Sequence, residues 1–350
     1  MGDLKSNMLW DFSVIYTEEY VIVVSNRKNM GTVLITGGAG FIGTNLAKHA
    51  LNRGWNVKII DNLSTGLQRN FDEMKRLGAE VVLGDVNDGT TVEKLSEGCD
   101  AVVHLAAQVS VPQSVSNPSE TMEVNVEGTQ NVIDACVKNN VKRLVTASSA
   151  AVYGEADKLP LSEESAGQVL SPYAESKWCN ESQIFEARQK GIQSTALRFF
   201  NVYGEGQRPD GAYAAVIPKF VEMLMQGIPP TINGDGLQTR DFVHVDDVCS
   251  AIFLLIEGEW KAEKHHVYNV ATQVEISLLQ LIDAINTSLQ KSDVNFVAIE
   301  PKFGPERPGD IKNSVADITR IHFTLGWSPK VNFSTGIERL IRERMNKLGE

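Results

Sequence analysis

The stretch Thr32-Val-Leu-Ile-Thr36-Gly37-Gly-Ala-Gly40-Phe41-Ile42-Gly43 decides the fold. Its apolar, β-branched start predicts a strand, and the rest predicts a glycine-rich loop that opens a helix. The early glycines permit a tight turn, Gly40 lets the backbone approach a pyrophosphate, and Gly43 permits close packing. Asp61, 21 residues after Gly40 at the end of a second predicted strand, can accept both hydroxyls of a ribose and would repel a 2′-phosphate. The sequence therefore predicts a dinucleotide site that prefers NAD to NADP.

From this stretch onward, short β-branched runs alternate with longer amphipathic stretches, which is typical of a parallel sheet with helices on both faces. The predicted strands are Thr32–Thr36, Val57–Ile60, Glu80–Leu83, Ala101–Leu105 and Arg143–Ala147, and the predicted helices cover 41–53, 88–98, 119–139, 246–257 and 277–290. After about residue 200, segments punctuated by glycine and proline replace this alternation. We predict an α/β fold with a Rossmann-type doubly wound parallel sheet and a smaller C-terminal α/β substrate lobe. Residues 30–200, with later returning segments, would form the cofactor domain, and 201–345 mainly the lobe.

The composition is that of a globular protein. Of the 350 residues, 42% are apolar and 22% are charged, which excludes a disordered chain, a collagen and a membrane bundle. No run approaches the roughly 18 uninterrupted apolar residues of a spanning helix. The net charge of −11 repels polyanions, so we expect neither a nucleic acid nor a membrane as partner. Any anionic ligand must then be bound by a few placed groups.

The four cysteines, Cys99, Cys136, Cys179 and Cys249, form no CxxC pair and no short cluster with histidine. This spacing argues against a zinc site and a disulfide framework, and it is typical of reduced, mostly buried thiols. We therefore expect a cytoplasmic protein without a metal site.

Residues 1–29 are harder to place. They carry acidic residues where a secretory signal would have a basic region and a clean apolar stretch, so they are not expected to be a signal peptide. The run Val21-Ile-Val-Val24 can pair as a short strand, and Met30 directly precedes the first strong strand pattern. We treat residues 1–29 as an appendage with no chemistry assigned.

Two further predicted strands end in short motifs. Gly84-Asp85-Val86 follows the third strand, and Leu105-Ala106-Ala107 follows the fourth. Ligands bind outside the carboxyl ends of parallel strands, so the adenine and nicotinamide halves of the cofactor would lie at these motifs. His104 lies inside the apolar fourth strand, and we expect it to be a packed histidine rather than a catalyst.

A candidate catalytic pair occurs in Ser171-Pro-Tyr173-Ala-Glu-Ser-Lys177. Tyr173 and Lys177 stand at positions i and i+4, on one helix face. A cation beside a phenol lowers the pKa of the phenol, and a positively charged nicotinamide would lower it further, so Tyr173 can act as a base near neutral pH. Ser148 and Ser149 end the fifth predicted strand, and one of their hydroxyls can bridge the phenol and a substrate oxygen. Alone, such a pair more often marks a surface helix face; after the dinucleotide loop it predicts catalysis.

In combination, these motifs resemble those of the extended short-chain dehydrogenase/reductase family, and specifically its nucleotide-sugar epimerases, over about residues 31–345. The motifs that carry the resemblance are, in order, the glycine loop, Asp61-Asn62-Leu-Ser64-Thr65-Gly66, Ser149, the Tyr173/Lys177 pair and Arg198-Phe-Phe200-Asn201-Val-Tyr-Gly204. In that family a tyrosine removes the proton of the sugar 4-hydroxyl while C4 delivers a hydride to tightly held NAD⁺. The 4-keto sugar then turns over, and the hydride returns to its opposite face.

The resemblance implies roles for residues of this chain. Ser149 would be the hydroxyl partner, Tyr173 the base, and Lys177 the anchor of the cofactor ribose that also tunes the pKa of Tyr173. The implied NAD contacts are Gly37, Gly40, Phe41, Ile42, Gly43, Asp61, Asn62, Ser64, Thr65, Gly66, Asp85, Val86, Leu105, Ala106, Ala107, Asn125, Tyr173, Lys177 and Phe200. The implied substrate contacts are Ser110, Ser149, Asn201, Val216, Arg240, Arg307, Asp310 and Ser314.

The choice among the family's reactions depends on the residues after Ser149. Dehydratases and a decarboxylase of the same fold need an extra acidic residue there, whereas this chain has Ala150 and Ala151. Methyl groups cannot move protons, which favours simple epimerisation at C4. Reduction of a free 4-keto sugar stays open, although those reductases resemble the chain less.

The substrate side is read from the resemblance. Arg240 and Arg307 can clamp the oxygens of a diphosphate, and Asp310 can accept a ribose hydroxyl. The segment Gly211-Ala-Tyr-Ala-Ala-Val216-Ile-Pro218 is similar to the uridine-binding segment of UDP-N-acetylglucosamine 4-epimerases, and Asn201 would bond the diphosphate or the sugar.

Position 314 limits the size of the sugar in this family. A tyrosine there would crowd a 2-acetamido group, whereas Ser314 leaves room for it, with Ser110 as a second contact. We therefore prefer UDP-GlcNAc/UDP-GalNAc as the substrate. UDP-glucose, UDP-glucuronate and UDP-N-acetylglucosaminuronate remain alternatives, and a non-catalytic NAD-binding sensor is a remote one. Family members commonly form homodimers through helices such as 119–139 and the one bearing Tyr173, which is our expectation here.

Overall fold

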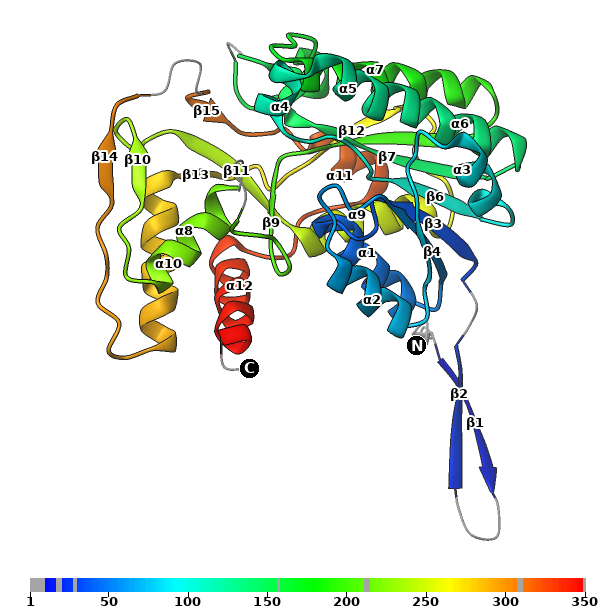
Figure 1. Cartoon of the computed structure of the whole chain (residues 1–350), viewed down its shortest axis with the longest axis horizontal. Coiled ribbons are helices and arrows are strands. Elements are labelled where there is room, and N and C mark those ends of the chain that lie inside the picture. The colour runs from blue at the N-terminus through cyan, green and yellow to red at the C-terminus, as the bar shows by residue number, and fades with distance from the viewer. Residues whose placement is uncertain are drawn as a thin grey trace, which may run out of the picture.

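The computed structural model describes residues 10–16, 21–27, 30–155, 158–210, 215–306 and 311–348. A parallel sheet of seven strands forms its centre, in the spatial order β12-β8-β7-β6-β3-β4-β5 (Figure 1). The strands are β3 (Thr32–Thr36), β4 (Asn56–Asp61), β5 (Glu80–Leu83), β6 (Ala101–His104), β7 (Arg143–Ser149), β8 (Gln193–Phe199) and β12 (Val267–Val270). The order reverses between β3 and β6, which creates the crevice where doubly wound sheets bind dinucleotides. The predicted fold class is confirmed.

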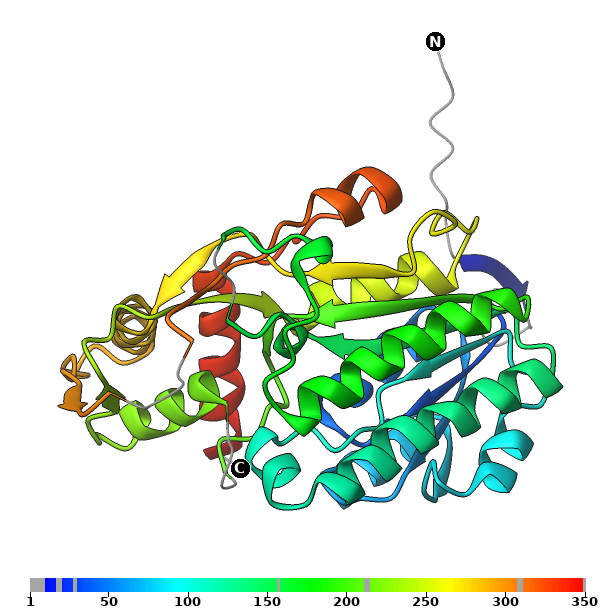
Figure 2. The same ribbon diagram turned by 90° about the horizontal axis from the view of Figure 1, so that it is seen from above.

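Helices cover both faces of this sheet because its strands are apolar on both sides. Val33 and Ile35 of β3 pack with α1 (Phe41–Asn52), α2 (Gln68–Arg76), α9 (Val245–Ile256) and α11 (Thr319–Leu325). Leu34, on the opposite side of the same strand, packs with α3 (Gly89–Ser96), α6 (Gly128–Lys138) and α7 (Pro172–Gln189). Figure 2 shows α6 and α7 along one side of the sheet and α9 along the other. Successive strand residues point to opposite faces, so one strand serves two cores.

The predicted helix over 119–139 is formed from Pro118 to Lys138, with a π-helical turn in its middle. The chain runs through α4 (Val111–Ser116), α5 (Pro118–Met122) and a π-helical turn, Glu123–Glu127, before α6 begins. Within this turn the carbonyl oxygen of Asn125 accepts hydrogen bonds from the Thr129 hydroxyl at 2.6 Å and the Asn180 amide at 2.8 Å. Side chains that bond a helix carbonyl in this way disturb the regular ladder, and short π-helical turns often occur at functional sites.

The smaller lobe follows Phe199. Its strands are β9 (Asn201–Tyr203), β11 (Thr239–His244), β13 (Glu275–Ser277) and β15 (Asn313–Ser314), with β10 (Thr231–Asn233) paired to β14 (Lys302–Gly304). Helices α8 (Val216–Met225), α10 (Leu278–Ser292) and α12 (Phe333–Leu348) enclose a separate apolar core with these strands. Helix α9 and strand β12 belong to the central sheet layer, so the chain returns to the cofactor domain from within the lobe.

The N-terminal segment contributes an antiparallel hairpin. Strand β1 (Trp10–Tyr16) pairs with β2 (Val21–Arg27), and the hairpin projects from the side of the cofactor domain (Figure 1). The possible strand over Val21–Val24 is therefore part of β2. Short 3₁₀ turns, Ala150–Tyr153 and Glu163–Ser165, follow β7. Within the described ranges, no helix combines the length and apolarity needed to cross a membrane.

All four cysteines are free thiols, and Cys99, Cys136 and Cys249 are buried. Burial raises the pKa of Cys99 to about 11 and the pKa of Cys136 to about 12, so both stay protonated at neutral pH. They act as small apolar side chains in the core, in agreement with the sequence-based prediction of reduced thiols.

Candidate active site

The glycine loop has the geometry of a phosphate cradle. Gly37 has a φ of +68°, and a Cβ atom there would lie 2.8 Å from the backbone nitrogen of Ala106. A Cβ atom on Gly43 would lie 2.2 Å from the carbonyl oxygen of Gly37. Helix α1 begins after Gly40, and in the described part of the chain no side chain caps it. Its first N–H groups are therefore placed to bind an anion, and the loop fits the pyrophosphate of a dinucleotide.

Asp61 lies at the end of β4 beside this loop and is buried. Its carboxylate accepts the Ala39 N–H at 2.9 Å on one oxygen and the Leu63 N–H at 2.8 Å on the other. Each carboxylate oxygen has a second lone pair, so Asp61 can still accept ribose hydroxyls. The neighbouring Asn62 donates to Asp85 at 2.7 Å, which ties the ends of β4 and β5 together.

The end of β6 is organised by Thr36. Its hydroxyl oxygen lies 3.2 and 3.1 Å from the backbone nitrogens of Leu105 and Ala106, which donate to it, and 2.7 Å from His104 Nδ1. The other ring nitrogen of His104 is 2.9 Å from the Thr129 hydroxyl. Burial, together with the charge of Lys177, lowers the pKa of His104 to about 3. His104 is a neutral packing residue, as expected.

Two predicted cofactor residues, Asn125 and Phe200, have side chains whose contacts are with other residues of the protein. The Asn125 amide accepts the Gln108 N–H at 2.7 Å and donates to the Gln108 carbonyl at 2.9 Å, so it holds the chain that follows Ala107. The ring of Phe200 is buried 5.9 Å from that of Tyr153. The Asn125 side chain is therefore used within the protein, and the Phe200 ring lies in an apolar cluster with Val152 and Tyr153.

The remaining predicted cofactor residues lie on the loops that follow the strands. Ser64, Thr65 and Gly66 precede α2, and a Cβ atom on Gly66 would lie 2.6 Å from Asp61. Val86 is buried after β5, where it packs against Gly128 at the start of α6.

The three predicted catalytic residues meet at the end of β7. Ser171 caps α7, with its hydroxyl accepting the Ala174 N–H at 3.1 Å and Pro172 in the first turn, and this start sets the direction of the helix. The hydroxyls of Tyr173 and Ser149 form a hydrogen bond, and Lys177 Nζ donates to the Ala147 carbonyl at 3.0 Å. The other serine at the end of β7, Ser148, donates instead to the Glu181 carboxylate. The fold therefore distinguishes Ser149 from Ser148.

The electrostatics correct one expectation. Burial raises the pKa of Tyr173 above its usual value, and the hydrogen bond with Ser149 opposes this effect only in part. Lys177 does not bring the pKa of the phenol below its usual range, because the burial of the phenol itself outweighs the effects that lower its pKa. Burial lowers the pKa of Lys177 to about 8, while the charge of Glu181 raises it. The protein by itself holds Tyr173 protonated, so its activation requires a further positive charge.

Three predicted substrate residues lie on neighbouring strands of the lobe. Asn201 of β9 stands opposite Phe242 of β11, and Arg240 of β11 stands opposite Ser314 of β15. The Asn201 amide donates to the Asp241 carbonyl at 3.0 Å, and Arg240 donates to the Thr239 carbonyl at 2.8 Å. The fold therefore places side by side residues that are far apart in the sequence.

Other predicted substrate residues are at the ends of helices. Ser110 caps α4 and accepts the Gln113 N–H at 3.2 Å, while Val216 begins α8. Arg307 and Asp310 lie outside the described residues, as do residues 211–214 of the predicted uridine-binding segment 211–218.

Sequence reasoning missed Asp241, which is fully buried beside Arg240. Its carboxylate accepts four hydrogen bonds: from the N–H and the hydroxyl of Thr272, and from the N–H groups of Gln273 and Ala316. Burial raises the pKa of Asp241, and these bonds oppose the rise. The residue fixes β11 against two other segments of the lobe. Its place directly after Arg240 in a recognised motif was the available signal.

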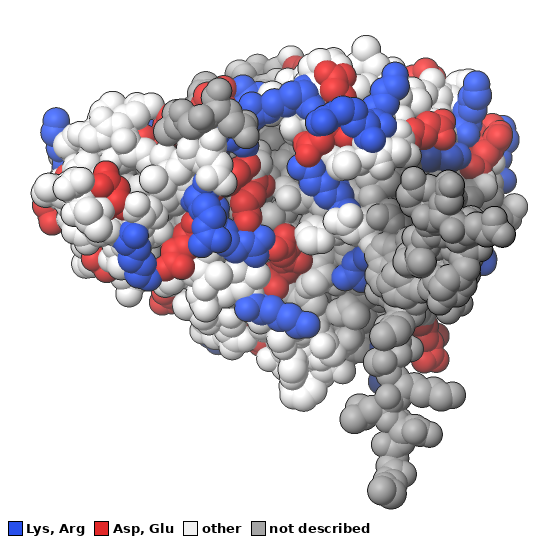
Figure 3. Space-filling view, turned by 90° about the horizontal axis from the view of Figure 1, so that it is seen from below, with Lys and Arg blue, Asp and Glu red and all other residues white. Residues whose placement is uncertain are grey.

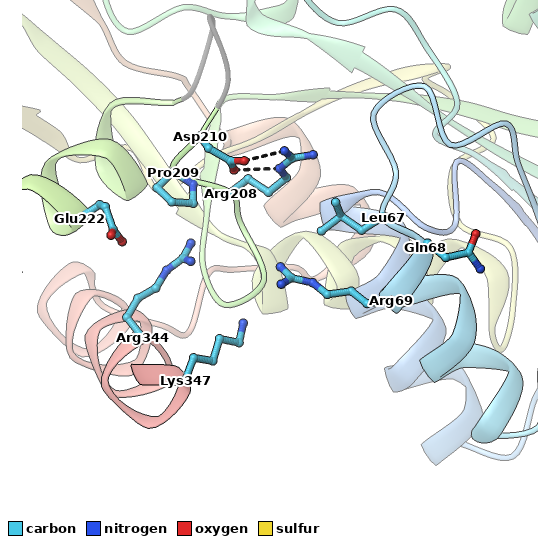
Figure 4. A pocket seen from close by; sticks show the side chains of 9 residues that line it. All are labelled: Leu67, Gln68, Arg69, Arg208, Pro209, Asp210, Glu222, Arg344 and Lys347. Atoms are coloured by element: carbon cyan, nitrogen blue, oxygen red, sulfur yellow. Dashed lines mark hydrogen bonds and ion pairs between the residues drawn. The ribbon is translucent and has the colours of Figure 1, made fainter. Parts of the chain in front are cut away.

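A cleft of about 600 Å³ lies on another face of the molecule, between α2 and α12. Its lining residues are Leu67, Gln68, Arg69, Arg208, Pro209, Asp210, Glu222, Arg344 and Lys347 (Figure 4). Arg208 forms two hydrogen bonds with Asp210, and Lys347 pairs with Glu343. Basic and acidic side chains are mixed on this face (Figure 3). Ser149, Tyr173 and Lys177 are not among the residues that line the cleft.

The sheet, the glycine loop and the Ser149, Tyr173 and Lys177 group define an NAD-dependent enzyme of the short-chain dehydrogenase/reductase type. A model of the "NAD dependent epimerase/dehydratase family" matches residues 33–271, and the chain belongs to this family. The predicted family and the predicted cofactor are thereby confirmed.

Known relatives cover nearly the whole chain. A UDP-glucose 4-epimerase of Mycolicibacterium smegmatis is 36% identical over 90% of this chain and 98% of its own length. The structure of a UDP-N-acetylglucosamine 4-epimerase from Methanobrevibacter ruminantium, in complex with UDP-N-acetylmuramic acid, is 34% identical with a TM-score of 0.84, over 91% of this chain and all of that one. The protein MoeE5, solved with UDP-glucuronic acid and NAD, is 31% identical with a TM-score of 0.77, and the match covers 91% of this chain and 100% of MoeE5. These relatives share the fold and differ in the sugar nucleotide.

Proposed function

We propose that this protein inverts the configuration at C4 of a UDP-sugar. The single observation that carries the proposal is the meeting of Ser149, Tyr173 and Lys177 at the carboxyl end of β7, beside a loop built for NAD. The relatives named above, which are epimerases or carry UDP-sugars, support the same reaction.

In this proposal, Tyr173 takes the proton of the sugar 4-hydroxyl and returns it after the sugar has turned over. Bound NAD supplies a reversible acceptor for the hydride of C4 and a positive charge near the phenol. Ser149 orients the reacting oxygen through its hydroxyl, and the Lys177 ammonium stabilises the negative charge on the Tyr173 oxygen. Because the protein alone raises the pKa of Tyr173, the base becomes effective only when the oxidised cofactor is in place.

The residues after Ser149 favour epimerisation over elimination. Ala150 and Ala151 form the 3₁₀ turn next to the reacting hydroxyls and carry only methyl groups. Removal of a proton at C5 requires a second acid or base close to the sugar, and these positions cannot supply one.

The sugar nucleotide is proposed to lie across the lobe. Residues 30–200, with β12 and α9, would hold the cofactor, and 201–345 would mainly hold the substrate. Arg240 and Arg307 would bind the diphosphate, Asp310 and Val216 the uridine, and Asn201 the diphosphate or the sugar. These assignments are supported by the positions of Asn201, Arg240 and Ser314 on strands β9, β11 and β15, which pair with one another through β11.

We propose an N-acetylated hexose as the preferred sugar. Ser314 is small, nearly buried and directly opposite Arg240 in the register of β11 and β15, so its position leaves volume beside a phosphate-binding side chain. Ser110 would be a second contact of the acetamido group. UDP-glucose and UDP-glucuronate remain the competing substrates, because relatives of similar identity carry them.

A substrate panel tests both levels of the proposal. The protein is incubated separately with UDP-GlcNAc, UDP-glucose and UDP-glucuronate, and the C4 epimers are followed by NMR. We expect the fastest turnover with UDP-GlcNAc. The Ser314→Tyr variant should lose that turnover while keeping the turnover of UDP-glucose, because the phenol fills the acetamido space. No epimer from any of the three would contradict the epimerase proposal, and fastest turnover of UDP-glucose would contradict the preference.

A homodimer is the proposed assembly. Helix α7 exposes Trp178 and Phe185, and α6 exposes Val137. Apolar side chains of this size on adjacent helices suit the isologous face of a second copy. Light scattering should give twice the 38.4 kDa of one chain, and a Phe185→Glu variant should give one chain. The free, buried thiols support a cytoplasmic location in the same proposal.

A further inference from the structure

A group of buried charges lies directly beneath the proton-transfer residues. Glu181 is on α7, four residues after Lys177 and eight after Tyr173, so the three belong to one stripe of the helix. Arg198 of β8 faces it across the sheet surface. Lys177, Glu181 and Arg198 are each less than 5% exposed, so water screens their charges very little.

The Glu181 carboxylate is fixed by three donors. Arg198 donates from Nε at 2.8 Å and from Nη2 at 2.7 Å, and the Ser148 hydroxyl donates at 2.5 Å. Two parallel bonds from one guanidinium and a third from a hydroxyl hold the carboxylate in one orientation. Ser148 precedes Ser149 in β7, so the same strand holds both the reacting hydroxyl and the carboxylate.

Arg198 is itself held on its other side. Its Nη1 donates to the Tyr153 hydroxyl at 2.9 Å and to the Glu163 carbonyl at 2.8 Å, and Tyr153 donates in turn to Asn269 at 2.6 Å. The guanidinium is therefore locked between β7, β8, the turn after Ser149 and β12. Because Glu181 and Arg198 are both held by these bonds, their side chains cannot move when the charge of Lys177 changes.

We propose that Glu181 is a positioning residue for the reaction: its carboxylate, held by Arg198 and Ser148, keeps the buried Lys177 protonated and so sets the alkaline limit of activity. The proposal concerns Lys177, which burial would otherwise favour in its neutral form. It rests on the proposed epimerase function only where activity is the measurement.

The groups around Lys177 support this assignment. Burial lowers the pKa of Lys177 to about 8, and the charge of Glu181 acts against that change. The titratable groups nearest to it on packed elements are Tyr173 on α7 and His104 on β6, both uncharged at neutral pH in the protein alone. Across the sheet surface, Arg198 and Tyr153 bond to Glu181 or to each other. The acids of the other helices packed on α7 are exposed: Glu120, Glu123, Glu127 and Asp134.

Two substitutions of Glu181 separate charge from shape. Glu181→Gln keeps the shape of the side chain and removes its charge, whereas Glu181→Asp keeps the charge and shortens the chain. In the NAD-loaded protein we expect the alkaline limb of the kcat/KM profile to move down by about 1 pH unit in Glu181→Gln and to stay in place in Glu181→Asp. A Glu181→Gln limb that coincides with the wild-type limb would overturn the proposal, because a purely structural residue would be more sensitive to the shortened chain.

A matched control lies on the same helix. Glu186 is exposed, and Glu186→Gln removes one carboxylate without touching the buried group, so its limb should match that of the wild type. If Glu181→Gln does not fold, because Arg198 is left without its partner, the double variant Glu181→Gln/Arg198→Met removes both charges. It should show the same direction of shift, since Glu181 acts on Lys177 and Arg198 acts through Glu181.

A second measurement does not depend on the substrate. The ammonium of Lys177 is followed by NMR of protein labelled with ¹⁵N at the lysine side chains, and Lys177→Met identifies the signal. We expect the signal to titrate at lower pH in Glu181→Gln than in the wild type. This result together with no epimer from any UDP-sugar would keep the inference and reject the epimerase proposal. An unchanged titration would reject the inference, whatever the activity.

Discussion

Two arginine–carboxylate clusters in this protein have bonds of the same length and very different surroundings. Beneath the active site, the side chains of Arg198 and Glu181 are 3% and 5% exposed, with 2.7 Å between Nη2 and Oε2. Between the two lobes, Arg339 of α12 lies 2.6 Å from Glu205 and 2.7 Å from Asp246, with side chains 25% to 34% exposed. The comparison teaches that the length of an ion pair does not decide its energetic importance, because the cost of losing a partner depends on how well water can replace it.

The two clusters also differ in what they join. The buried pair connects α7 to β8 within the cofactor domain, next to reacting groups. The exposed cluster joins α12 to α9 and to the loop after β9, and Asp246 lies 2.9 Å from His49 of α1. It thus fastens the small lobe to the cofactor domain at a distance from Tyr173. We expect variants of the first cluster to change catalysis and stability strongly, and variants of the second to change stability slightly.

The largest effect should come from the reacting group above the buried pair. Tyr173→Phe removes the proton acceptor and should lower turnover by about 10³-fold, the order expected for a general base. The unfolding free energy should change by about 1 kcal/mol or less, since one hydrogen bond with Ser149 is lost. Both are measured on NAD-loaded protein, with Arg339→Met as the control that keeps its turnover. A Tyr173→Phe variant that keeps more than a tenth of the wild-type turnover would contradict the proposed role of Tyr173.

Next in size is the loss of the buried arginine. Arg198→Met leaves the Glu181 carboxylate in the core without its main partner, and it should lower the unfolding free energy by about 3–5 kcal/mol. Urea unfolding monitored by circular dichroism gives this value. The double variant Glu181→Gln/Arg198→Met should recover much of the loss, because no unpaired charge remains. Equal destabilisation by the single and double variants would show that packing, rather than charge, dominates here.

The exposed cluster should respond far less to the same kind of change. Arg339→Met removes two ion pairs, yet it should lower the unfolding free energy by only about 1 kcal/mol, since the side chains of Glu205 and Asp246 are 26% and 25% exposed and water can replace part of the lost bonds. The same urea experiment measures it. A loss as large as that of Arg198→Met would break the comparison, because it would mean that exposure does not separate the two clusters.

The smallest effect is a dependence on pH at the lobe junction. The hydrogen bond from His49, and then that from Arg339, holds the pKa of Asp246 below its usual range. A carboxyl group with a depressed pKa stabilises the folded state above its unfolded pKa and loses that contribution as the pH falls through the folded value. The difference in melting temperature between the wild type and Asp246→Asn should therefore be largest near pH 7 and shrink below about pH 4. A difference that grows on acidification would contradict this assignment.

Much of the fold could be predicted because its signals are local. The β-branched runs and the amphipathic stretches between them located five strands of the sheet to within two residues at each end. The π-helical turn at Asn125 was not predicted, because it depends on the side chains of Thr129 and Asn180. Helical periodicity does not register such contacts.

The candidate site could be predicted in part for the same reason. Tyr173 and Lys177 were found from their spacing of four residues, and continuing that spacing by four more reaches Glu181. The importance of Glu181 was missed because its partner Arg198 lies on a different element, strand β8. The direction of the change in the pKa of Tyr173 was also wrong, since the sequence reveals the neighbouring cation and not the burial of the phenol.

The sequence by itself determined the cofactor class and the spacing of the candidate catalytic pair, because a tight glycine turn, the acid at the end of the second strand and a helix face are set by residues close along the chain. Only the tertiary structure decided that Ser149 rather than Ser148 meets Tyr173, and that Asn201, Arg240 and Ser314 share one small sheet. It also decided that Lys177, Glu181 and Arg198 are all buried and that Glu181 pairs with Arg198. The physical reason is that the pairing of distant strands decides which side chains meet, and burial decides how strongly their charges interact. Neither is present until the chain has folded.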